Sequence, residues 1–279
     1  MSLVNIPFGF MSEADGVEYL LDAYGTDVNR AYSVRQLSST ATNCLQVKRA
    51  SDSATQNIGF VNNELDTASI ASFCSGTTGY VSIWYDQSSN GYDAIEATTN
   101  GPVIFDAGSV PTSSIQGKPM LDYADGATDS SFGFNTNWTA GSAYAFYIYT
   151  SRGTAATYTF GGTAGGSKPA FINGYVGSNV EWFASNRYTI SSGASIVDPR
   201  SYAVSNDGTT VIAHFDGTQA FSNPAGGIVS GANMDTIGGS GPSNDLYGGN
   251  MQEFIIFDAT KTSDRSSILA NQNAYFQTY

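Results

Sequence analysis

Short runs of alternating apolar and polar residues dominate the chain, and turns rich in Gly, Asn, Asp and Ser separate them. In residues 80–85, Tyr80, Ser82 and Trp84 share one face of an extended strand, and both faces are largely apolar. Comparable runs cover residues 143–149, 201–204, 210–215 and 251–257. This period of two predicts short antiparallel strands buried in a layered structure.

Turn and helix signals complete the expected architecture. Residues 206–208 (Asn-Asp-Gly) and 216–217 (Asp-Gly) predict hairpin turns, because Gly accepts the positive φ that these turns require. Helical spacing of apolar residues is confined to residues 17–24, residues 66–73 and a C-terminal segment capped by Ser263. The pattern predicts an all-β fold, a two-sheet antiparallel sandwich with a few short helices.

Composition narrows the range of partners. The 279 residues include 11 Lys and Arg against 24 Asp and Glu, a formal net charge of −13, and 13% of them are aromatic. So many aromatic residues exclude a disordered acidic chain. A nucleic-acid partner requires a basic face, which 11 cations among 24 acids do not form, so we expect none.

We expect a lectin-like sandwich domain over residues 31–279, preceded by an arm and short helix over residues 1–30 that would serve as a docking segment. No apolar run approaches the roughly 18 residues of a membrane helix, and the start has no basic region followed by an apolar one. We therefore expect no membrane partner, and a chain that is cytoplasmic in origin or already processed. Cys44 and Cys74 are too few for a disulfide scaffold, and buried free thiols are favoured over a bridge.

A family resemblance rests on an ordered set of segments. They are residues 31–38, 46–52, 56–59, 73–74 and 84–94, the last of which begins Trp-Tyr-Asp-Gln. Their order resembles the opening half of the catalytic domain of fungal α-L-arabinofuranosidase B, a glycoside hydrolase with a concanavalin A-like jelly roll. It is also similar to lectin-like (LamG-like) modules of bacterial surface proteins and bacteriophage structural proteins. Residues 117–126, 215–217 and 249–258 fit the same fold, so the resemblance implies a concanavalin A-like jelly roll.

The resemblance also implies catalytic residues that this sequence does not show in the expected places. A retaining glycosidase uses two carboxylates about 5 to 5.5 Å apart. In the family, the acid is an Asp after an Ile-Gly-Gly run, but here Ser240 follows that run. The nucleophile is a strand Glu, yet residues 167–176 contain no carboxylate. The family's adjacent cysteine pair is missing near residues 158–161, and Gly79 stands where a cysteine would close a loop with Cys74.

Five residues are candidates for ligand binding. Trp138 and Trp182 would stack on sugar rings, and Glu181 would bind hydroxyl groups beside Trp182, although large aromatic residues in a sandwich more often belong to the core. Asp86 and Gln87 would bind a sugar or a cation, although we favour a role for Asp86 in capping the turn that follows it.

Metal and ion-pair signals are weaker. Calcium would bind at Asp122, Asp125 and Asp129, but an ordinary solvated turn is favoured, so no cofactor is expected. Lone His214 excludes a His-rich zinc site. Arg35, Lys48 and Arg49 lie near Asp52 in the sequence, and we expect an ion pair there that holds the first strands together rather than a site for a carboxylated ligand.

These observations lead to a first hypothesis, with two others left open. The first is a non-enzymatic virion structural or adhesion protein: a capsid decoration protein, head fibre or tail receptor-binding component. It would form homo-oligomers and bind neighbouring virion subunits and cell-surface glycans. The alternative is a glycoside hydrolase of α-L-arabinofuranosidase type, with Glu181 as nucleophile and Asp235 or Asp245 as acid. The third is a lectin that is secreted or displayed at a cell surface.

Overall fold

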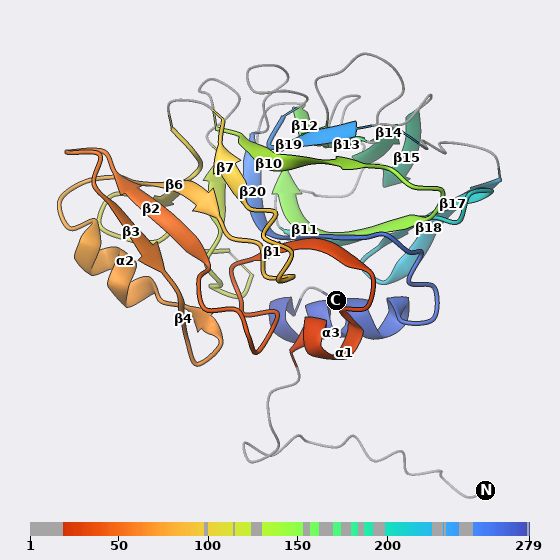
Figure 1. Cartoon of the computed structure of the whole chain (residues 1–279), viewed down its shortest axis with the longest axis horizontal. Helices are drawn as coiled ribbons and strands as arrows, with labels where there is room; N and C mark the ends of the chain where they lie inside the picture. Colours follow the sequence, from red (N-terminus) through yellow and green to blue (C-terminus); the bar gives the residue numbers. More distant parts are fainter. Residues whose placement is uncertain are drawn as a thin grey trace, which may run out of the picture.

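The computed structural model of the chain is a sandwich of antiparallel strands with short helices on one side (Figure 1). The structure describes residues 19–97, 100–113, 115–123, 130–152, 157–161, 170–173, 180–183, 187–191, 199–224, 231, 233–239, 248–277 and 279. Among these residues, no helix is long and apolar enough to cross a membrane.

The first layer has the strand order β1, β20, β11, β16, β17, β18. Its members are β1 (Val28–Ser33), β20 (Gly249–Phe257), β11 (Tyr144–Arg152), β16 (Arg200–Asn206), β17 (Thr210–Phe215) and β18 (Thr218–Pro224). Both predicted hairpins lie here, one between β16 and β17 and the other between β17 and β18. Gly208 and Gly217 have φ angles of +87° and +76°, which explains why glycine follows aspartate in each turn.

The second layer continues through ten strands. In spatial order they are β3 (Thr55–Ile58), β2 (Leu45–Arg49), β6 (Gly79–Trp84), β7 (Ala94–Glu96), β10 (Phe132–Thr139), β19 (Asn233–Ile237), β12 (Thr157–Gly161), β13 (Ala170–Asn173), β14 (Val180–Phe183) and β15 (Arg187–Ser191). β8 (Val103–Phe105) and β9 (Leu121–Tyr123) connect β6 with β20, and β4 (Phe60–Val61) pairs with β5 (Glu64–Leu65). The predicted all-β sandwich is confirmed.

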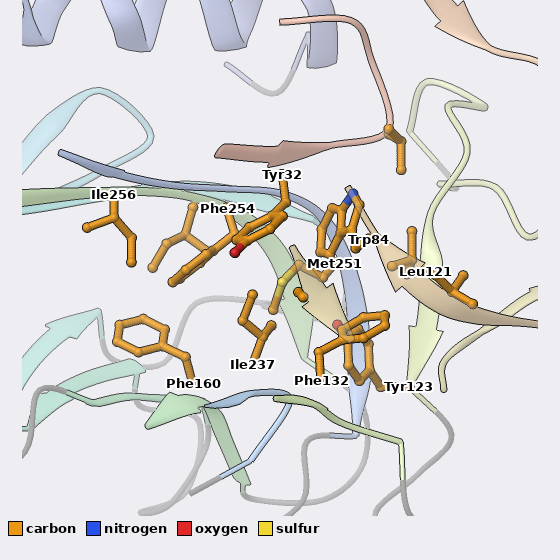
Figure 2. Close-up of a cluster of buried hydrophobic side chains, with 14 of the residues drawn as sticks. Tyr32, Trp84, Leu121, Tyr123, Phe132, Phe160, Ile237, Met251, Phe254 and Ile256 are labelled. Atoms are coloured by element: carbon orange, nitrogen blue, oxygen red, sulfur yellow. The ribbon is translucent and has the colours of Figure 1, made fainter. Parts of the chain in front are cut away.

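The main core lies between the two layers and is rich in aromatic rings (Figure 2). Phe146 of β11 and Phe254 of β20 enter it from the first layer, and Phe160 of β12 enters from the second. The ring of Phe160 lies 5.1 Å from the ring of Phe146 and 5.1 Å from that of Phe254, measured between centroids. Aromatic packing of this kind adds to the free energy of area burial and fixes the spacing of the layers.

The expected alternation in residues 80–85 is wrong at one position. The register between β2 and β6 shifts between Gln46 and Val47, so that Ser82 is an extra residue on β6. A bulge reverses the direction of the side chains beyond it. Val81 and Trp84 are therefore both fully buried, although strict alternation would place them on opposite faces.

The outer face of the first layer packs against two helices, α1 (Leu20–Tyr24) and α3 (Arg265–Phe276). Figure 1 shows both helices beneath β1 and β11. Tyr147 and Ile255 meet Ile268 of α3 in this second cluster. The third helix, α2 (Thr67–Phe73), lies within the predicted residues 66–73 and is capped by Asp66, whose carboxylate accepts a hydrogen bond from Ser69 N at 3.0 Å.

The two cysteines are free and buried, as expected. Burial raises the pKa of both thiols. A Cβ atom at Gly79 would lie 2.6 Å from Sγ of Cys74. Gly79 and Cys74 are thus neighbours in space, which agrees with the loop closure that the resemblance implies at these two positions.

A buried ion pair joins the first layer to α3. Nε of Arg35 donates to Oε2 of Glu253 at 2.8 Å, and Glu253 is fully buried. Ser33 Oγ donates to Oε2 at 2.8 Å, and Gln272 Nε2 of α3 donates to Oε1 at 3.0 Å. Nη1 of Arg35 also donates to Oδ1 of Asn271 at 2.7 Å. The carboxylate thus receives the hydrogen bonds that a buried charge needs.

The cations near the start of the chain divide between two kinds of pair. Arg49 pairs with Asp52 in an exposed turn, as expected, and Lys48 pairs with Glu96 of β7. Arg35 instead takes the buried partner on β20. Only the buried pair combines desolvation with several hydrogen bonds, so removal of one partner is costly there and nearly neutral at the surface.

We predict that Arg35→Ala lowers the free energy of unfolding by about 3 kcal/mol or more, because it leaves the buried Glu253 carboxylate without its countercharge. Arg49→Ala, which breaks an exposed pair, should cost less than about 1 kcal/mol. Urea denaturation followed by circular dichroism measures both values. Equal small losses in the two variants would contradict the importance of the buried pair.

Candidate functional site

The Asp86 carboxylate is fully engaged with backbone and hydroxyl donors. Its Oδ1 accepts hydrogen bonds from Ala31 N and Ser88 N, both at 2.9 Å. Its Oδ2 accepts from Ser88 Oγ at 2.7 Å and Tyr92 N at 3.0 Å. Asp86 thus caps the turn that follows and also anchors β1.

Gln87 holds the next part of the chain in the same way. Its Oε1 accepts from Leu37 N at 2.7 Å, and its Nε2 donates to the carbonyl oxygens of Ser33 and Arg35 at 2.9 and 3.1 Å. The side chain is buried. The geometry assigns Asp86 and Gln87 a structural function, and ligand binding by either residue stays a prediction.

Trp138 lies near the end of β10 and is almost fully buried. Its indole ring packs edge-to-face against Tyr144 at 5.4 Å and Phe146 at 5.2 Å between centroids. Nε1 donates to Oδ1 of Asp258 at 2.9 Å. Only a small part of the ring borders a cavity, so the expected stacking on a sugar stays a prediction.

Glu181 and Trp182 lie on β14, and only their backbone is described. Glu181 is paired with Ile172 of β13 and with Thr189 of β15. β13 pairs with β12, and β12 pairs with β19, the strand that carries Asp235. The proposed nucleophile and one proposed acid are therefore on the same run of strands.

The other predicted positions divide between described and undescribed parts of the chain. Asp235 is half-buried, and its Oδ1 accepts from Thr236 Oγ1 at 2.7 Å. Ser240 and Asp245 lie outside the described residues, as do Asp125 and Asp129 of the calcium hypothesis, whereas Asp122 is on β9. Within the described residues, no group of three His, Cys, Asp or Glu side chains is arranged to hold a metal ion.

Lone His214 lies on β17, facing the side of the layer that α3 covers. It is 8% exposed, and its Nδ1 has no hydrogen-bond partner. Burial and the nearby positive charge of Arg265 lower the pKa of His214 to about 4. The imidazole is therefore neutral in the folded protein near neutral pH, and it contributes to packing between β17 and α3.

A cavity that the sequence analysis did not predict lies beside Trp138. It has a volume of about 410 Å³, and its lining includes Asn29, Arg30, Tyr92 and Asp258 as well as Trp138. These residues come from separate parts of the chain, so no local motif marks them. Arg30 is a buried cation at the start of β1, and its partners become visible only in the folded chain.

The protein is a layered jelly-roll sandwich, and its sequence defines the family to which it belongs. The model of the alpha-L-arabinofuranosidase B catalytic family matches residues 20–170, which is more than half of the chain. The protein belongs to this family, and the resemblance stated from the sequence is confirmed. The match ends before Glu181 and Asp235, so it includes neither proposed catalytic carboxylate.

Solved structures share the fold. An arabinofuranosidase complexed with arabinofuranosyl-alpha-1,2-xylobiose aligns with a TM-score of 0.69 at 20% identity, covering 91% of this chain and 64% of that one. A GH54 α-L-arabinofuranosidase with a cyclic sulfate inhibitor aligns with a TM-score of 0.68 at 19% identity, over the same shares of the two chains. The protein thus spans less than two thirds of these relatives. Comparison with curated proteins finds no significant match.

The hypothesis of a non-enzymatic virion protein is wrong. The family is that of an enzyme's catalytic domain, and the two solved structures named above are arabinofuranosidases. The error came from two expected catalytic positions, since Ser240 replaces the acid and residues 167–176 contain no carboxylate, and from the lack of an export signal. These absences outweighed a resemblance that covers most of residues 31–279.

We predict that His214 makes the protein less stable in acid. The pKa of His214 is about 4 when folded, and about 6.5 in an unfolded chain, so the unfolded state binds the proton first. Its contribution is fully present above pH 6.5 and is lost as the pH falls to 4. Wild type should lose roughly 2 kcal/mol more than His214→Gln between pH 7 and pH 4.5 in urea denaturation. Equal losses of stability in wild type and His214→Gln would contradict the lowered pKa of His214.

Proposed function

We propose that the protein is a glycoside hydrolase that releases α-L-arabinofuranosyl groups. The observation that carries this proposal is the family match over residues 20–170, because it identifies the chain by sequence and not only by fold. The structural likeness supports it, since it covers 91% of the chain and therefore extends beyond the segment that the family model matches.

In the proposed reaction, two carboxylates act on opposite sides of the glycosidic bond. Glu181 attacks the anomeric carbon as the carboxylate, while an Asp donates its proton to the leaving oxygen, so that a glycosyl-enzyme ester forms and the alcohol departs. The same Asp, now ionised, then takes a proton from water. The water attacks the anomeric carbon and restores Glu181, and the sugar leaves with its configuration retained.

The spacing of the strands in the second layer helps to decide whether Asp235 or Asp245 is the acid. Two strands lie between β14 and β19, so the backbones of Glu181 and Asp235 are about 14 Å apart in a flat sheet with a strand spacing of about 4.8 Å. A retaining pair needs carboxyl groups about 5 to 5.5 Å apart. Asp235 would meet this requirement only where the sheet curves strongly, whereas this limit does not apply to Asp245, which lies outside the described residues. We therefore favour Asp245 as the acid.

We predict that Glu181→Gln lowers kcat on 4-nitrophenyl α-L-arabinofuranoside by about 10³-fold or more, because an amide is a poor nucleophile. Glu96→Gln, which alters a carboxylate of β7 paired with Lys48, is the matched control and should retain activity. Azide should rescue a Glu181→Ala variant by forming the glycosyl azide. Full activity of Glu181→Gln would exclude this nucleophile, and an inactive wild type that still binds arabinofuranosides would favour a lectin.

The general acid can be identified from the activity on substrates with different leaving groups and from the pH dependence of that activity. Loss of the general acid should lower kcat/KM about 10²- to 10⁴-fold for substrates with a poor leaving group and much less for an activated aryl substrate. It should also remove the fall in activity at high pH, because that fall reports the ionisation of the acid. We expect this behaviour from Asp245→Asn and near-normal kinetics from Asp235→Asn. The reverse pattern would assign the acid to Asp235.

A further inference from the structure

The cavity beside Trp138 is formed where four segments of the chain meet, one of which provides Tyr92. The end of β10 provides Thr136 to Thr139, the start of β1 provides Asn29 and Arg30, and Asp258 follows β20. Its volume of about 410 Å³ lies within the range of pockets that bind small ligands. The pocket does not include β12 or β14, so it is separate from Glu181.

Arg30 provides a fixed positive charge at this pocket. Its side chain is 1% exposed, and its guanidinium group lies over the rings of Tyr92 and Phe134, 4.8 and 4.2 Å from their centroids. Nε donates to Oδ1 of Asn29 at 2.9 Å, and Nη1 donates to the carbonyl oxygen of Thr136 at 3.0 Å. The two rings and two hydrogen bonds hold the guanidinium in one place.

Asp258 provides an exposed carboxylate that is already oriented. Oδ1 accepts from Nε1 of Trp138 at 2.9 Å, and Oδ2 accepts from Nδ2 of Asn29 at 2.8 Å. A carboxylate has about four acceptor positions, so these two bonds leave acceptor capacity on both oxygens. Because the donors come from two different strands, the carboxylate needs no rearrangement to accept hydrogen bonds from a ligand.

The outer wall of the pocket is also held in place. Thr139 Oγ1 donates to Oδ1 of Asn233 on β19 at 2.7 Å, and Gly231 N donates to the carbonyl oxygen of Ala140 at 2.7 Å. Nδ2 of Asn206 donates to the carbonyl oxygen of Ser142 at 3.3 Å. Anchored walls reduce the conformational entropy that a ligand would have to remove.

We propose that this pocket is a binding site for a neutral sugar, additional to the proposed catalytic site. The positive charge of Arg30 and the negative charge of Asp258 balance each other, so the pocket favours neither an anionic nor a cationic ligand. The oriented carboxylate accepts hydrogen bonds from hydroxyl groups, and amide and hydroxyl side chains of Asn137 and Ser142 surround the opening. Tyr92 and the edge of Trp138 provide apolar contact for the C–H groups of a sugar ring.

Xylobiose is a suitable probe, because it is neutral and has no arabinofuranosyl group for the proposed hydrolase to remove. We expect it to shift the backbone amide signals of residues 136–142 in ¹H–¹⁵N NMR spectra, with a Kd in the millimolar range. Asp258→Asn should weaken this binding about 10-fold, since a hydrogen bond to a charged acceptor is lost. Asn137→Trp, which changes an exposed side chain at the opening, should abolish the shifts.

Two controls make the outcome decisive. Asp52→Asn removes an exposed carboxylate at the turn between β2 and β3 and should leave the Kd unchanged. Glu181→Gln should bind xylobiose like wild type, so a failure of the proposed hydrolysis and a failure of this site are distinguishable. No shifts at residues 136–142 with tens of millimolar xylobiose, equal affinity in Asp258→Asn, or tighter binding of glucuronate would overturn the proposal.

Discussion

The ion pair between Arg35 and Glu253 is the constraint on which the arrangement of the first layer depends. Glu253 is at the centre of that layer, because β20 pairs with β1 on one side and β11 on the other. A buried carboxylate is tolerated only when its charge and its lone pairs are satisfied, and here the partners come from β1, the segment after it and α3. Any other register of these elements would leave the carboxylate unpaired, so this one interaction selects the native arrangement.

The constraint extends along β1 to the pocket. Gln87 binds the carbonyl oxygens of Ser33 and Arg35, next to the buried pair, and Asp86 binds the amide of Ala31. These two side chains thus fix Ala31 and Ser33 of β1, and Ala31 is next to Arg30 at the pocket. The most distinctive sequence motif of the chain therefore acts through backbone hydrogen bonds, and its functional consequence is the position of other residues.

The sequence was sufficient to predict the features that depend on residues close together in the chain. Period-two runs predicted strands, and Asp-Gly turns predicted the two hairpins. The bulge at Ser82 was not predictable, because it depends on the register against β2 rather than on the residues of β6. The pocket was missed for the same reason, since Asn29 and Asp258 are distant in the chain and adjacent in the fold. The functional error arose because two missing carboxylates, one at position 240 and one in residues 167–176, outweighed a resemblance that covers most of residues 31–279.

The ladder between β10 and β19 connects the two proposed sites. Thr139 at the pocket is paired with Asn233, and Gly133 further along β10 is paired with Thr236, next to Asp235. Two residues of extended strand, about 7 Å, separate Asn233 from Asp235. The same ladder therefore borders the pocket at one end and leads at the other into the chain that carries Asp245.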